Sequence, residues 1–438
     1  MNVFNNSEVQ ECARWFSVAQ KVDDVLVAWS KLKARHPKLS GIVHLDNYEH
    51  STMPASIKKY TQAPNDYLVS YYISDSLYFI DDAMIREILD NNEKKFAVDY
   101  SIMFDTNMAS YINRLVQGKA IGDNRGELQG KVLRVIDDLL RDNLNFDFIF
   151  YMLENIKNVA TKGDFYTSSK LKFWMSLNKD LRENITSLHL FSSIDNKLYK
   201  KTLNPKPMLS HRQSVRKAID ASFDFYRGKV GREQAEQWTL FQRMMLLCLI
   251  GMVRIQLASN RSAKNKMSEF FNFMHEVTGA YMDREAQFAL NYFLSPSSAS
   301  ILNKVHKGCK TKRLLKRLDN IAWDMLAPRY MEKLLTHSAT GSCEYFVPYF
   351  LSFDNGLREM LNQHKIKGAI YHRETGDVIS FPGNDSGGLY EKNGLKNVIE
   401  RFFSSELKSE RESRVKLNRV SVHKAIIEEY DKLKQVIN

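Results

Sequence analysis

The sequence predicts a strongly helix-rich α/β protein, in which a small, mostly parallel sheet is interrupted by a large helical insertion and preceded by a helical N-terminal region. Apolar side chains recur at helical spacing over most of the 438 residues. Two short apolar runs instead indicate strands that lead to Asp105 and Asp354, and the first of them passes directly into a helix. A hydrophobic content of 44% is enough for a large core.

The length of the chain favours two or three structural units. Changes of pattern along the chain divide it into five segments. They are a mostly helical N-terminal region (1–97), the first part of a sheet-containing domain (98–162), a helical insertion (163–300), the second part of that domain with a hairpin (301–392), and a charged helical C-terminal segment (393–438).

The first elements follow from apolar periodicity and from proline. Residues Ser7–Ala34 carry apolar side chains at helical spacing, and this helix ends near Pro37 because the residue before a proline disfavours the α conformation. A loop-rich stretch covers 39–56, and the aromatic segment Tyr67–Ile80 is either a strand or a short helix. Residues 96–104 then predict a strand that runs into a helix.

The later elements continue this pattern. The apolar run Met244–Val253 is about half the ~20 residues needed to cross a bilayer, so we expect a buried core helix. A basic helix is expected over 303–335 and a strand over 344–357. Residues 367–382 predict a β-hairpin with its turn at Glu374–Asp377.

The cysteines and the N-terminus indicate an intracellular setting. The four cysteines, Cys12, Cys248, Cys309 and Cys343, lie far apart in the sequence and show no zinc-type spacing. We therefore expect reduced, mostly buried thiols. The first residues lack a basic segment followed by an apolar one, so the sequence predicts a cytoplasmic protein with no membrane partner.

The charge balance favours an anionic partner. Lys and Arg total 63 against 51 Asp and Glu, which gives a formal net charge of +12. Such an excess attracts polyanions, most commonly nucleic acid, although charge that serves only solubility is the alternative. We predict RNA or DNA as the partner, with a further protein partner possible in a larger assembly.

Two basic stretches could contact phosphates, although a solvated helix face is the usual fate of such a run. The densest comprises Lys304, His306, Lys307, Lys310, Lys312, Arg313, Lys316 and Arg317. The second comprises Lys197, Lys200, Lys201, Lys206, Arg212, Arg216 and Lys217. Tyr199 and Tyr226 lie near the second stretch, where they could stack on bases or pack in the core.

Four acids are candidates for chemistry: Asp105 in FDTN, Glu154 in YMLEN, Asp324 in AWDML and Asp354 in SFDNG. Gathered carboxylates bind hard cations such as Mg²⁺ or Mn²⁺, which orient water and stabilise charge on a transferring phosphoryl group. Each acid has a structural alternative. Asp105 could cap a helix, Glu154 could be solvated, Asp324 could pair with Lys316, Arg317 or Arg329, and Asp354 could begin a turn.

The order of these motifs resembles that of PIN-domain nucleases. In that family an Asp ends the first strand and is followed by Thr or Ser and Asn, an acid lies on a middle helix, an Asp on a later helix, and another Asp closes a late strand. Here the series is Phe104-Asp105-Thr106-Asn107, then Glu154, Asp324 and Ser352-Phe353-Asp354. The resemblance covers the segments 98–160 and 312–375.

The resemblance implies a metal-dependent nuclease that hydrolyses phosphodiester bonds. Asp105, Asp324 and Asp354 would ligate Mg²⁺ or Mn²⁺, and Glu154 would assist directly or through water. Supporting roles fall to Thr106, Asn107 and Ser352. Because 170 positions separate Glu154 from Asp324, most of that interval would be an insertion, and Asp283 or Glu285 competes with Glu154 for the middle-helix role.

Two further interpretations compete with the nuclease. The chain could be a non-catalytic helical module that binds nucleic acid or protein within a larger assembly, its acids serving as caps and ion pairs. The aromatic segment 67–80 could instead mark a structural component. If the nuclease interpretation holds, a toxin or anti-phage effector is the expected context. The sequence carries no P-loop, nucleophile-elbow or His-Glu-x-x-His motif.

Overall fold

The structure is a computed structural model that describes residues 7–32, 38–46, 48, 53–62, 67–90, 98–121, 126–160, 169–336, 345–383, 386–414 and 419–438. The chain forms two compact units. Unit 1 comprises Met1–Glu236, Tyr330–Phe353 and Ala369–Ile379, and unit 2 comprises Gln237–Arg329, Asp354–Gly368 and Ser380–Asn438. Cys343 lies outside the described residues. The prediction of a helix-rich α/β protein is confirmed, and each unit is described by itself.

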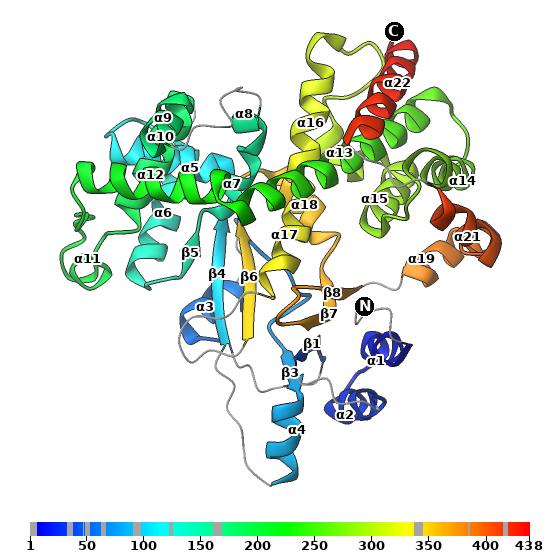
Figure 1. Ribbon diagram of the computed structural model, residues 1–438, viewed down its shortest axis with the longest axis horizontal. Helices are drawn as coiled ribbons and strands as arrows, with labels where there is room; N and C mark the ends of the chain where they lie inside the picture. Colours follow the sequence, from blue (N-terminus) through cyan, green and yellow to red (C-terminus); the bar gives the residue numbers. More distant parts are fainter. Residues whose placement is uncertain are drawn as a thin grey trace. The chain divides into compact units, whose positions relative to one another are not determined.

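A four-stranded mixed sheet forms the centre of unit 1 (Figure 1). Its order is β2 (Leu68–Ser70), β6 (Tyr345–Leu351), β4 (Val98–Phe104) and β5 (Phe146–Asp147). Strand β4 is parallel to both β6 and β5, whereas β2 is antiparallel to β6. The two strands predicted to end near the acidic motifs are therefore direct neighbours.

The register of β4 and β6 pairs Val98 with Tyr345 at one end and Phe104 with Leu351 at the other. All seven residues of β4 are buried, which explains why five of them are apolar and why the run does not alternate with solvent-exposed positions. Pro348 lies within β6, outside the three-residue ladder with β2, so its missing N–H removes no bond from that ladder.

A second sheet, which the sequence did not predict, has the order β3-β1-β7-β8. It joins β3 (Leu77–Asp81), β1 (Leu39–His44), β7 (Ile366–His372) and β8 (Val378–Pro382). The predicted hairpin is confirmed: the His372 N–H donates to Asp377 and the Gly376 N–H donates back to His372, with Gly376 at φ +70°. The aromatic segment 67–80 supplies strands β2 and most of β3, so the strand alternative is correct.

Strand β1 lies where the sequence predicted a loop-rich stretch. Its six residues are all buried, although Ser40 and Gly41 weaken the apolar signal. A Cβ on Gly41 would lie 2.7 Å from the Phe16 side chain and 2.9 Å from Ile80. Close packing therefore requires glycine at this position. Because glycine is unfavourable inside a strand, the sequence does not indicate β1.

The predicted N-terminal helix is two helices, α1 (Ser7–Val18) and α2 (Val22–Ser30). The Asp24 carboxylate accepts hydrogen bonds from the backbone N–H groups of Gln20 and Lys21, at 2.9 and 3.2 Å, and so begins a new helix. Apolar periodicity continues through the break, which is why the sequence pattern misses it.

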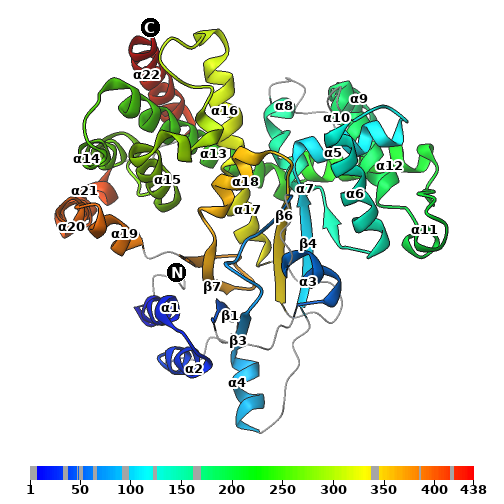
Figure 2. The same cartoon turned by 180° about the vertical axis from the view of Figure 1, so that it is seen from behind.

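Helices cover one end of the unit 1 sheet. Helices α5 (Thr106–Val116), α10 (Lys179–Phe191) and α12 (His211–Arg227) lie side by side, and both views show this layer (Figures 1 and 2). The other unit 1 helices are α3 (Ala55–Gln62), α4 (Asp82–Leu89), α6 (Glu127–Arg141), α7 (Ile149–Glu154), α8 (Ile156–Ala160), α9 (Lys170–Ser176) and α11 (Asn196–Thr202).

Unit 2 is built around the second half of α13 (Lys229–Ala258). Residues Met245–Leu249 are fully buried, and Gly251 packs directly against the Phe273 ring, so the predicted core helix is correct. In the described part of the chain, one helical stretch, Gly231–Ala258, is long and apolar enough to span a membrane. Its most apolar window is 61% buried within the protein.

The remaining unit 2 elements are mostly short helices. They are α14 (Ala263–Phe273), the π-helical turn η2 (Met274–Thr278), α15 (Asp283–Leu294), α16 (Leu314–Asp324), α18 (Asn355–Asn362), α19 (Ser386–Lys392), α20 (Lys396–Phe402), α21 (Ser405–Ser413) and α22 (Arg419–Ile437), with 3₁₀ turns η3 (Pro296–Ser298), η4 (Ser300–Leu302) and η5 (Thr311–Arg313). Helix α17 (Ala327–Leu334) runs from unit 2 into unit 1.

The predicted basic helix over 303–335 is wrong in its first part. Gly308 adopts a left-handed conformation at φ +78°, and its N–H donates to the Ile437 carbonyl at 2.9 Å. The segment before α16 is therefore a series of turns held against the end of α22.

A buried ion pair links α15 to Arg329 in unit 2. Both carboxylate oxygens of Glu285 accept from Arg329, at 2.7 and 2.5 Å. Burial raises the pKa of Glu285, but the Arg329 guanidinium outweighs burial and leaves that pKa below its usual value. Glu285 is therefore ionised in the folded protein near neutral pH.

Replacing Glu285 with Gln should lower the free energy of unfolding by about 3–5 kcal/mol, because it leaves a buried guanidinium without its counter-charge. The urea midpoint measures this effect. Glu127→Gln is the matched control, because Glu127 pairs with Lys131 on an exposed helix face and its loss should cost below about 1 kcal/mol. Equal losses in the two variants would contradict the assignment.

A buried histidine makes unit 2 sensitive to acid. Burial lowers the pKa of His364 to about 4, against 6.5 for an exposed histidine. The unfolded chain therefore binds more protons between these values, so the stabilisation is fully present above pH 6.5 and is lost as the pH falls towards 4. Its Nδ1 atom has no hydrogen-bond partner among the described residues.

Wild-type protein should lose about 2 kcal/mol of stability between pH 7 and pH 5 through His364. His364→Gln should remove that part of the pH dependence, as measured by urea unfolding at both pH values. His306→Gln, at an exposed position, should leave it unchanged. An unaltered pH dependence in His364→Gln would refute the assignment.

Candidate functional site

Asp105 and Ser352 lie at the same edge of the unit 1 sheet, because each follows the C-terminal end of one of two paired parallel strands. The Asp105 N–H donates to the Leu351 carbonyl at 3.3 Å. The Ser352 hydroxyl donates to Asp105 Oδ2 at 2.6 Å, although 247 positions separate the two residues. Both side chains are buried. The carboxyl edge of parallel strands is where open α/β sheets place their ligands.

Asp105 is also a helix cap. Its Oδ1 atom accepts a hydrogen bond from the Met108 N–H at 2.7 Å, at the start of α5. Asp105 therefore has the helix-capping role that was given as the alternative to a metal ligand. Capping occupies only part of the carboxylate, because an ionised carboxylate offers about four acceptor positions.

Glu154 reaches the same site from α7. The Thr106 hydroxyl donates to Glu154 Oε2, and Thr106 directly follows Asp105. Glu154 is 6% exposed, whereas Thr106 and Asn107 are exposed. We call Asp105, Thr106, Glu154 and Ser352 the strand-edge site. It brings together two of the four predicted acids and two of the three predicted supporting residues, with Asn107 next to it on the solvent side.

The other two predicted acids belong to unit 2. Asp354 is exposed and caps α18, accepting from the Leu357 N–H at 3.0 Å, and Asp324 is the half-buried last residue of α16. Over the described residues, no group of three or more His, Cys, Asp or Glu side chains is arranged to hold a metal ion.

The alternates Asp283 and Glu285 are both engaged in unit 2. Asp283 accepts from Tyr281 at 2.6 Å and from Gln287 at 2.7 Å. Burial raises the pKa of Asp283, and these two hydrogen bonds only partly offset that increase. Glu285 is held by Arg329, as described above. Both side chains are thus explained by packing of α15 against its neighbours.

The basic stretch before α16 is an exposed surface of unit 2. The exposed cations are Lys304, Lys307, Lys310, Lys312, Arg313 and Lys316. Among the residues that the structure describes, none of the six has a carboxylate within 4.0 Å. Arg317 differs, because its guanidinium donates to the Lys304 carbonyl at 2.5 Å and so holds the turn. We call the six exposed cations the α16 basic surface.

The two tyrosines near the second basic stretch are not available for stacking on bases. Tyr199 is 8% exposed and its hydroxyl donates to Asp137 at 2.8 Å. Tyr226 is buried and donates to the Met152 carbonyl at 2.6 Å. The core-packing alternative is correct for both.

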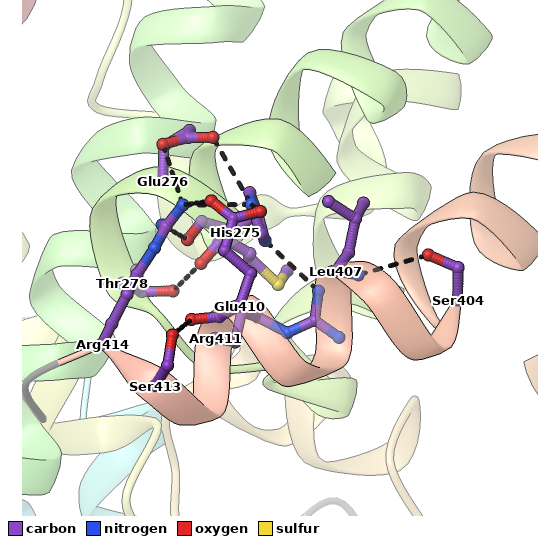
Figure 3. Close-up of polar contacts among 10 residues, drawn as sticks. His275, Glu276, Thr278, Ser404, Leu407, Glu410, Arg411, Ser413 and Arg414 are labelled. Atoms are coloured by element: carbon purple, nitrogen blue, oxygen red, sulfur yellow. Dashed lines mark hydrogen bonds and ion pairs between the residues drawn. The ribbon is translucent and has the colours of Figure 1, made fainter.

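Sequence reasoning missed a cluster around His275 in η2 (Figure 3). Arg411 of α21 and Arg414, which directly follows that helix, contact the two ring nitrogens at 3.3 and 3.1 Å, and Arg414 also donates to the His275 carbonyl at 2.5 Å. Glu276 and Glu410 flank the ring at 3.5 and 3.3 Å. Arg411 lies 136 positions after His275 in the sequence, so no local motif could reveal the cluster. It fastens α21 to the π-helical turn.

No protein-family model, curated protein or solved structure matches this sequence. The function is therefore inferred from the geometry and from the motif order alone.

Thr106→Val should destabilise unit 1 by about 1–3 kcal/mol, because it removes a hydrogen-bond donor from a buried carboxylate. Thr106→Ser should retain most of the stability, since it keeps the hydroxyl. The urea midpoints of the two variants test the bond, and identical midpoints would show that Glu154 does not depend on it.

Proposed function

We propose that this protein is a metal-dependent nuclease, with the strand-edge site as its catalytic centre. The observation that carries the proposal is that Asp105 and Glu154, from separate elements, meet through Thr106 at the carboxyl edge of two parallel strands. Packing alone does not favour burying two carboxylates at such an edge, because each must be desolvated.

The residues fit a hard divalent cation. Mg²⁺ and Mn²⁺ take oxygen ligands, and the strand-edge site offers two carboxylates beside two hydroxyls. When bound there, the ion would polarise a phosphoryl oxygen and lower the pKa of a water nucleophile. Asp105 and Glu154 would hold it, Ser352 and the Met108 N–H would orient the Asp105 carboxylate, and exposed Thr106 lies on the side open to substrate.

Nucleic acid is the proposed substrate class, and the α16 basic surface is proposed to contact its phosphates. Its six cations are exposed and, in the described chain, carry no neutralising carboxylate. Such cations release condensed counterions when they bind phosphates, which drives association at low salt. The proposed nuclease acts on RNA or DNA.

A second candidate is a non-catalytic module that binds nucleic acid. The observation in its favour is that Asp105 and Asp354 both cap helices, at Met108 and Leu357. Under this proposal the carboxylates serve folding, and binding occurs without cleavage.

Cleavage of labelled single- and double-stranded RNA and DNA with Mn²⁺, Mg²⁺ or EDTA distinguishes the two. The nuclease predicts metal-dependent cutting that falls at least about a hundredfold in Asp105→Asn or Glu154→Gln, since each removes charge that acts on the reacting phosphate. Mn²⁺ titration calorimetry should show binding to wild type that either variant loses. Asp324→Asn and Asp354→Asn test the remaining predicted ligands separately.

Asp99→Asn is the matched control. Asp99 is a buried carboxylate on the same strand, where it accepts from the Tyr100 N–H and from Asn145. It should keep cleavage and Mn²⁺ binding even if it lowers stability. Cutting that survives in EDTA, or in folded Asp105→Asn protein, would exclude the proposed site, and nucleic-acid binding without cutting would favour the second candidate.

A further inference from the structure

A cleft of about 870 Å³ opens on unit 1 between α3, the end of α6 and α11. Its walls include Lys59, Arg141, Asn143, Asn196, Lys197 and Lys200. The volume lies within the range of specific ligand sites, and most of the lining side chains are polar. None of the residues of the strand-edge site lines it.

Of the acids that line this cleft, Asp142 is paired with a cation, whereas Asp195 caps α11 by accepting from the Lys197 and Leu198 N–H groups at 2.9 and 3.0 Å. Asp137 lies nearby and is also paired. Asp142 accepts from Lys59 at 2.9 Å and from the Tyr60 hydroxyl at 2.5 Å. Asp137 accepts from Arg141 at 2.9 Å and from Tyr199. Burial raises the pKa of Asp142, but these bonds outweigh it and leave that pKa below its usual value. The walls therefore hold paired charges that stay fixed at neutral pH.

The remaining lysines form no ion pair within the described part of the chain, so the cleft carries an excess of positive charge. Lys197 and Lys200 are exposed and three positions apart on α11, so they project from one helix face. Lys201 and Lys206 follow close behind and are also exposed. Across the described ranges, none of these four has a carboxylate within 4.0 Å.

The other wall groups suit a nucleotide strand. The Asn196 amide donates to Asn143 at 2.7 Å, which leaves further amide donors and acceptors at the cleft for base edges. Ile194 and Met208 add apolar surface, and Met208 is 69% exposed. Lysines on one side with amides and apolar contacts beside them match phosphates on one side of a strand and bases on the other.

We propose that this cleft binds one strand of nucleic acid, with Lys197 and Lys200 on its phosphates. The inference rests on the proposed function, whose substrate class it narrows to single-stranded RNA or DNA. It concerns binding only, so it can be tested where no cleavage occurs.

Fluorescence anisotropy of the full chain in EDTA, with labelled RNA and DNA strands of about 12 nucleotides and their duplexes, tests the proposal. Lys197→Glu/Lys200→Glu should weaken single-strand binding on the order of tenfold. Between about 50 and 200 mM salt, the slope of log affinity against log salt should become shallower by about 1.4, as expected for the loss of two phosphate contacts. Lys197→Arg/Lys200→Arg should bind like wild type.

Lys119→Glu/Lys172→Glu is the matched control, because these lysines are exposed on unit 1 and do not line the cleft. Each exchange of Lys for Glu removes two charges, so both double variants lower the formal net charge from +12 to +8. The control should keep the wild-type slope. Thermal unfolding should show all variants folded, since the four side chains are exposed.

The proposal is overturned if wild-type protein binds no single strand, if it prefers duplex, or if the cleft variant and the control lose affinity equally. A nucleoside monophosphate that displaces the strand at equal concentration would also overturn it, because it would show a mononucleotide site. If no cleavage occurs in Mn²⁺ but the cleft variant still loses strand binding, the nuclease proposal fails. The proposal that the cleft binds a single strand is then retained.

Discussion

The parallel pairing of β4 with β6 is the constraint on which the rest of unit 1 depends. It joins segments 247 positions apart, and its register sets Phe104 against Leu351. Asp105 and Ser352 then emerge at one edge because parallel strands end together. The positions of Asp105 and Ser352 follow from this alignment, since a shift of one strand by one residue would turn its side chains to the opposite face.

Burial at that edge has an energetic consequence. A carboxylate removed from water must recover hydrogen bonds, and Asp105 does so from a backbone N–H and a hydroxyl, while Glu154 accepts from Thr106. These bonds hold two acids in fixed positions before any ligand arrives. In the proposed nuclease, these preorganised carboxylates would hold the cation, and the same bonds stabilise the fold.

In unit 2, burial and ion pairs set the charge states of the buried side chains. Its core helix α13 is nearly all apolar where it is buried, and the charges around it are matched inside the unit, as with Arg254, which contacts Glu269 and Glu429. His364 is kept neutral by burial, whereas Glu285 is kept charged by Arg329. The six cations of the α16 basic surface have no such partners in the described chain, and water and salt screen them.

The sequence by itself determined the fold class, the strands that lead to Asp105 and Asp354, the hairpin, and the core helix, because these depend on local apolar pattern and turn chemistry. It placed the end of the second strand too late, since β6 ends at Leu351. It could not reveal β1, whose Gly41 answers to Phe16 from another element, or the break between α1 and α2, which depends on one side-chain cap. Only the tertiary structure decided the partners of the acids: Glu154 accepts from Thr106, the residue after Asp105, while Glu285 accepts from Arg329. Such pairings arise from long-range packing, which no short stretch of sequence encodes.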